Sequence, residues 1–147
     1  MGGVMLRRLT TRLPLLIALA TAGLLLASCG TQQSADLFQV DRAGSIPGAK
    51  LKLIVSDSGT ATCNGGTPKA LPGDQLLAAR DLAARLAEDK DKPRTLIGFS
   101  HSIYDFKVTF GAGKIEWKDG DPNVPASFKE LVYLTRKIAK GTCGLSR

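Results

Sequence analysis

The stretch Tyr104-Asp105-Phe106-Lys107-Val108-Thr109-Phe110 (YDFKVTF) alternates apolar and polar side chains without interruption. Successive side chains of a β-strand point to opposite faces of a sheet, so this pattern predicts a strand with one buried and one exposed face. Residues 111–113 follow as a hairpin loop, and residues 115–118 alternate again as the returning strand. We therefore expect an antiparallel hairpin whose aromatic residues belong to the core. These aromatic residues are Tyr104, Phe106, Phe110 and Trp117.

Three further strands are expected before this hairpin, over residues 37–41, 50–55 and 60–63, because they alternate and end at turn-forming residues. Pro72-Gly73-Asp74 precedes a helical stretch that runs to about Asp89, and Pro125 opens a last helix that we expect Gly141 to cap. Apolar residues recur at helical spacing on both helices. They are Leu76, Ala79, Leu82, Ala83 and Leu86 on the first helix, and Phe128, Leu131, Leu134, Thr135 and Ile138 on the second. On the other side of the first helix, Asp81, Arg85 and Asp89 follow one another at intervals of four residues, and we expect them to form an exposed charge ladder.

The element order is therefore βββαββα. Antiparallel hairpins with two amphipathic helices predict an α+β fold, with a sheet of about five strands and both helices packed on one face.

Residues 1–28 have the composition of a secretory signal peptide. Residues 13–27 carry no charge and are rich in leucine and alanine, and the only charged side chains before them are Arg7, Arg8 and Arg12. A basic start, a short apolar segment and small residues before a cleavage site are typical of export signals. The apolar segment is shorter than the roughly 20 residues that a spanning helix needs. We therefore expect residues 1–28 to be removed.

The leader ends in Leu26-Ala27-Ser28-Cys29, which resembles the bacterial lipobox at all four positions. The resemblance implies cleavage before Cys29, which then carries diacylglycerol and palmitate, and two or more acyl chains anchor a protein stably. Residues 29–36 would form a lipidated polar tether and residues 37–147 a single domain. We expect the protein at the outer face of the cell membrane, or at the outer membrane if the cell has one. A buried cysteine that merely follows a leader is the alternative.

Export would place Cys63 and Cys143 in an oxidising compartment, where such a pair is usually bridged. A disulfide between them would close a long loop, for which the chain-entropy model gives roughly 4.5 kcal/mol. The alternative is a metal site. The sequence has no Cys-x-x-Cys motif and a single histidine, His101, which together make a poor zinc-binding set. We therefore predict a disulfide and no metal ligand.

Charge and motifs favour neither nucleic-acid binding nor catalysis. Loss of the three leader arginines lowers the net charge from +7 to +4, and no run of more than two basic residues remains. His101 lies in the segment Gly-Phe-Ser-His-Ser at residues 98–102, which has only one of the glycines of a nucleophile elbow. Asp57, Asp119 and Asp121 fit turn chemistry better than a calcium loop. We expect no catalytic residue, cofactor, metal or nucleic-acid partner.

Two family resemblances cover the domain. Residues 63–66 (CNGG), 76–89 (LLAARDLAARLAED) and 143–145 (CGL) resemble small secreted or lipid-anchored actinobacterial proteins, which implies no chemistry. Residues 38–44 (FQVDRAG), 104–110 (YDFKVTF) and 124–132 (VPASFKELV) resemble emfourin, a proteinaceous inhibitor of thermolysin-like metallopeptidases. The Arg-Ser-Gly-Gly typical of emfourin is Arg42-Ala43-Gly44-Ser45 here. We therefore carry over no inhibitory residue and identify residues 42–47 as the loop to test.

The favoured hypothesis is a non-enzymatic, lipid-anchored domain that lies outside the cytoplasm and binds an envelope or secreted protein. A peptidase inhibitor of the emfourin kind is the alternative. A third hypothesis is an enzyme that uses His101, or a carrier of small ligands with a pocket between helices and sheet.

Overall fold

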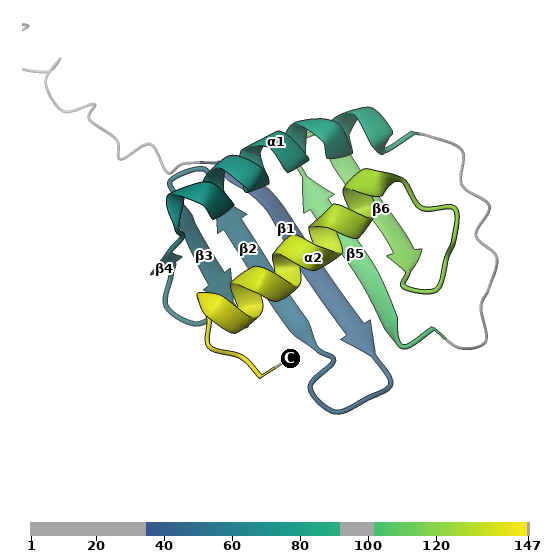
Figure 1. Cartoon of the computed structure of the whole chain (residues 1–147), viewed down its shortest axis with the longest axis horizontal. Helices are drawn as coiled ribbons and strands as arrows, with labels where there is room; N and C mark the ends of the chain where they lie inside the picture. Colours follow the sequence, from purple (N-terminus) through teal and green to yellow (C-terminus); the bar gives the residue numbers. More distant parts are fainter. Residues whose placement is uncertain (1–34, 92–101, 147) are drawn as a thin grey trace, which may run out of the picture. The chain divides into compact units, whose positions relative to one another are not determined.

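A computed structural model describes residues 35–91 and 102–146, which belong to one unit, Ser34–Arg147. Its six strands form one antiparallel sheet in the order β4-β3-β2-β1-β5-β6, and both helices lie on the same face of that sheet (Figure 1). The fold is therefore α+β, as the sequence predicts. The strands are β1 (Asp36–Gly44), β2 (Leu51–Ser56), β3 (Thr60–Cys63), β4 (Lys69–Ala70), β5 (Tyr104–Phe110) and β6 (Gly113–Lys118). The helices are α1 (Gly73–Asp89) and α2 (Ala126–Gly141).

Strand β5 has the faces that its alternating sequence predicts. Phe106, Val108 and Phe110 are buried, whereas the residues between them are exposed. The strand lies between β1 and β6. The sequence predicts that the first strand ends at residue 41. In the structure β1 continues to Gly44, which pairs with Tyr104 of β5. At its other end β1 begins at Asp36, one residue before the expected start of the domain.

The sixth strand, β4, is the one the sequence analysis did not predict. It has two residues, which pair with Thr60 and Ala61 of β3. Both of its residues are exposed, so no alternation of apolar and polar side chains marks it. The backbone N–H of Leu71 then donates to the Gly59 carbonyl at 2.9 Å, which holds the chain beside β3 up to the start of α1.

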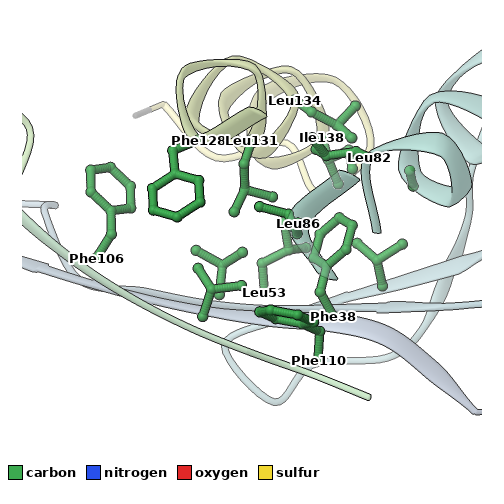
Figure 2. Close-up of a cluster of buried hydrophobic side chains, with 14 of the residues drawn as sticks. Phe38, Leu53, Leu82, Leu86, Phe106, Phe110, Phe128, Leu131, Leu134 and Ile138 are labelled. Atoms are coloured by element: carbon green, nitrogen blue, oxygen red, sulfur yellow. The ribbon is translucent and has the colours of Figure 1, made fainter. Parts of the chain in front are cut away.

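The core lies between the sheet and the two helices (Figure 2). All five α2 residues predicted to face inward are buried. On α1, Ala79, Leu82 and Leu86 are buried. The other two α1 residues predicted to face inward, Leu76 and Ala83, are only half-buried. Figure 2 shows Phe106 and Phe128 on one side of this layer and Phe38 and Phe110 near its other side.

Ion pairs join the exposed sides of the helices. Arg85 of α1 pairs with Asp81 at 2.9 Å and with Glu130 of α2, and Asp74 pairs with Lys137 at 3.0 Å. Arg85 lowers the pKa of the Glu130 carboxyl, chiefly by donating a hydrogen bond to it. The pairs Arg85–Glu130 and Asp74–Lys137 each join one end of α1 to the opposite end of α2, so the two helices run antiparallel.

Two features of the helix ends differ from expectation. Asp89 is not part of an exposed charge ladder, because it is buried and accepts a hydrogen bond from the Ser127 hydroxyl at 2.5 Å. Gly141 lies inside α2 rather than capping it. The left-handed residue is Gly144 (φ 73°), after which the Leu145 N–H donates to the Ala139 carbonyl at 2.9 Å. Within the described ranges, neither helix is long and apolar enough to cross a membrane.

Candidate functional site

A concavity of about 770 Å³ is formed by four strands of the sheet, β1, β2, β5 and β6, together with Lys50, Asn64 and Asp121 beside them. Pockets of roughly 300–1,000 Å³ are typical of ligand sites. Most of its lining residues alternate with core residues along their strands, so their side chains point away from α1 and α2. The accessible lining residues are Asp41, Ala43, Lys50, Lys52, Asn64, Asp105, Lys107, Glu116 and Lys118. The concavity therefore opens on the sheet face that the helices leave uncovered.

The concavity occupies one end of the sheet. Its residues come from the last part of β1 (residues 41–43), the first part of β2, the first part of β5 (residues 105–107) and the last part of β6 (residues 116–118). Because neighbouring strands are antiparallel, these parts meet at the end opposite the start of β1 at Asp36.

A row of charged residues crosses this surface. Asp41 of β1 pairs in register with Lys52 of β2 and with Lys107 of β5, and Lys107 pairs with Glu116 of β6. The sign of the charge alternates along the row. Opposite charges that face each other across strands stabilise a sheet, so the row supports the sheet and lines the concavity. Ala43 also lines the concavity and has the smallest side chain among the accessible lining residues.

Most charged groups on the β5–β6 side already have partners. Lys118 lies 3.6 Å from Asp105, and Lys107 lies 3.8 Å from Glu116. Lys114 lies closer to Glu116, at 2.8 Å, and its hydrogen bond is the main reason that the pKa of Glu116 is lowered. Lys107 and Lys118 therefore have carboxylate partners across the strands, and Lys114 has its partner along β6.

The β2 side of the concavity has free hydrogen-bond donors. Among the residues that the structure describes, neither Lys50 nor Lys52 forms an ion pair. Asn64 has a positive φ of 53° and is fixed against β2 by two bonds. Its N–H donates to the Lys52 carbonyl at 2.7 Å, and its Oδ1 accepts from the Lys52 N–H at 2.9 Å. Since Oδ1 faces that N–H, Nδ2 remains available as a donor.

Arg42 holds the loop beside the concavity from the inner side. Its side chain is buried, with Nε donating to the Ala49 carbonyl at 2.7 Å and the guanidinium 5.0 Å from the centre of the Tyr104 ring. Burial lowers the pKa of Arg42. In the loop singled out by the emfourin resemblance, the accessible residues therefore include Ala43, Gly44 and Ser45 but not the Arg42 guanidinium. Peptidase inhibition by this loop stays a prediction.

The structure brings together the two cysteines that the sequence analysis pairs. Cys63 at the end of β3 and Cys143 after α2 are joined by a disulfide, with Cα atoms 6.3 Å apart, a separation usual for such bonds. The bond ties the C-terminal end of the helix layer to the sheet. Cys29 and His101 lie outside the described residues.

The three aspartates considered as ligands have structural partners. Asp119 accepts hydrogen bonds from the Ser102 hydroxyl at 2.7 Å and from the Ile103 N–H at 3.0 Å, and Asp121 accepts from the Asn123 N–H at 2.9 Å. Asp57 instead pairs with Arg80 of α1 at 2.7 Å, a contact that the sequence analysis did not predict. Within residues 35–91 and 102–146, no cluster of three histidine, cysteine, aspartate or glutamate residues is placed to hold a metal ion.

The aromatic residues of the hairpin serve the core, as predicted. Phe106, Phe110 and Trp117 are buried, whereas Tyr104 is half-buried and packs against the edge of the core. Phe106 stacks on Trp117 with ring centres 5.0 Å apart. No sequence pattern marks the concavity. The outward lysines beside Leu51 were visible as an alternation, but their position opposite Asp41 and near Asn64 depends on strand pairing.

Neither a scan of protein-family models nor searches of curated proteins and of solved structures found a match to this chain.

Proposed function

We propose that this protein is a lipid-anchored, non-enzymatic binding module that presents the uncovered face of its sheet to an envelope or secreted protein. The observation that carries the proposal is the concavity on that face, lined by accessible charged side chains. The opposite face of the sheet is already covered by α1 and α2 and buries the apolar core.

The position of the concavity suits a protein tethered at Cys29. Seven residues from Cys29 to Asp36 span at most about 25 Å, so the start of β1 would stay near the membrane. The concavity lies at the opposite end of β1, five to seven residues further along, or about 20 Å at the rise of a β-strand. A tether at Cys29 would therefore join the domain at the end of β1 opposite the concavity.

The test uses a photo-crosslinking amino acid at Ala43 or at Ala84 of the full-length protein in intact cells. Both alanines are exposed, but Ala43 lies in the concavity and Ala84 on the solvent side of α1. We expect a discrete crosslinked species from position 43 that is absent from position 84. Equal crosslinking from both positions, or none from position 43 in correctly localised protein, would contradict the proposal.

A further inference from the structure

The β2 side of the concavity differs from the β5–β6 side in its unused hydrogen-bonding capacity. On the β5–β6 side, Lys107 and Lys118 have carboxylate partners within 4 Å. On the β2 side, Lys50 and Lys52 have none among the described residues, and Asn64 Nδ2 has no acceptor there either. Three donors with no acceptor therefore lie along one edge of the concavity.

These three donors are close together because of the local backbone. Lys50 and Lys52 are two residues apart, so their side chains leave the same face of the sheet with Cα atoms roughly 7 Å apart. Asn64 is bonded to both backbone groups of Lys52, which places its amide beside that lysine. A carboxylate accepts hydrogen bonds at two oxygens and gains from nearby ammonium groups. We propose that Lys50, Lys52 and Asn64 bind a carboxylate of a peptide segment that also carries a positive charge.

The carboxylates of the concavity support the choice of a mixed-charge peptide. Asp41, Asp105 and Glu116 line the same concavity, and they would repel a ligand that carries many negative charges. Asp41 lies in register with Lys52 and accepts one bond from Gln39 at 2.6 Å through Oδ2. A ligand carboxylate at Lys52 therefore has a protein carboxylate one strand away, where an ammonium group of the same peptide is favoured.

This inference rests on the proposed function, since it assigns a ligand class to the same surface. It also gives Asn64 a second role. The side-chain oxygen holds the β2–β3 connection, whereas the nitrogen contacts the ligand. An Asn64→Asp substitution separates these roles, because an aspartate oxygen can still accept from the Lys52 N–H while the donor is replaced by a negative charge.

The binding test uses the full chain, purified from membranes in neutral detergent micelles. The probe is a rhodamine-labelled, capped tetrapeptide with one glutamate and one lysine, and binding is followed by fluorescence anisotropy. We expect the double variant Lys50→Gln/Lys52→Gln to weaken binding about tenfold, and Asn64→Asp to weaken it severalfold without changing the thermal midpoint. The matched control is Lys129→Gln/Lys140→Gln, which removes two exposed lysines from α2, and we expect it to bind as the wild type does.

Several results would overturn the inference. They are absence of binding by the wild type at millimolar peptide, equal weakening by the α2 control, and tighter binding of a capped hexaglutamate than of the mixed-charge peptide. Crosslinking at position 43 separates this failure from that of the proposed function. If the crosslinked species persists while peptide binding fails, the docking face stands and the peptide-carboxylate site is wrong. If both fail, the proposed function is wrong as well.

Discussion

Gly44 sets the geometry of the sheet at the end that carries the concavity. A Cβ atom at this position would lie 2.4 Å from the Ile103 carbonyl oxygen and 2.8 Å from the Cβ atom of Ala49. One contact is with a backbone carbonyl and the other with the methyl group of a buried alanine, so neither neighbour can rotate away. A glycine is required here for close approach of chain segments rather than for a left-handed conformation.

We therefore predict that Gly44→Ala lowers the free energy of unfolding by about 2 kcal/mol, through overpacking at the β1–β5 pair. The measurement is urea unfolding followed by circular dichroism. Gly111→Ala is the matched control, because a Cβ atom there would contact nothing within 4 Å. Equal stability of Gly44→Ala and the wild type would show that the loop moves aside at no cost.

Single residues are also where sequence analysis was least informative. Gly141 and Gly144 are both plausible helix caps by type, and the choice of Gly144 depends on where the chain turns to reach Cys63. Asp89 has the spacing of an exposed ladder, but burial beside Ser127 depends on how α1 packs against the start of α2. Neither outcome is encoded in a local pattern.

At the scale of elements, the alternation of apolar and polar residues predicts a strand correctly where that strand has one buried and one exposed face. β5 and the buried stripe of α2 follow their sequence patterns over their whole length. The end of β1 could not be predicted in the same way, because residues 42–44 are strand through pairing with β5. β4 could not be predicted because its two residues are both exposed and therefore show no alternation of apolar and polar side chains.

The contact between helices predicts a small dependence of stability on pH. Because Arg85 lowers the pKa of Glu130 in the folded protein, the pair stabilises the fold above the unfolded-state pKa of about 4.3. This stabilisation is lost as pH falls through the lowered folded-state value. We expect Glu130→Gln to lower the free energy of unfolding by at most about 0.5 kcal/mol at pH 7, because the pair is exposed. At pH 2 we expect no difference from the wild type.

Urea unfolding at pH 7, 5, 3 and 2 measures this dependence. Glu88→Gln is the control on α1, because Glu88 is exposed and forms no ion pair with a described residue. A difference between Glu130→Gln and the wild type that persists unchanged at pH 2 would mean that the charge of Glu130 is not its cause.

At the scale of the whole molecule, the disulfide joins β3 to the segment after α2 across 80 residues of sequence. We predict that Cys63→Ser/Cys143→Ser lowers the free energy of unfolding by about 3 kcal/mol, because the unfolded chain gains conformational freedom. The measurement is urea unfolding of both proteins. Thiol titration of the exported wild-type protein provides the chemical check, and free thiols at both positions would contradict the bond.

The candidate site is a property of the whole molecule, which explains why sequence alone did not identify it. The row from Lys52 to Glu116 uses four strands that are up to 64 residues apart in the sequence. Alternation assigns each of these residues to an exposed face, but only the strand order β2-β1-β5-β6 places them side by side. The α+β fold class was therefore predictable from the sequence, whereas the charged surface that the four paired strands form was not.

We propose that Cys29 carries the lipid that tethers this domain, and intact mass spectrometry of protein purified from membranes tests this attachment. We predict a mass that corresponds to residues 29–147 plus diacylglycerol and acyl chains. We also predict that Cys29→Ala leaves the membrane fraction once it is processed. A membrane-bound protein that retains residues 1–28, or a processed Cys29→Ala protein that stays in the membrane, would contradict the account.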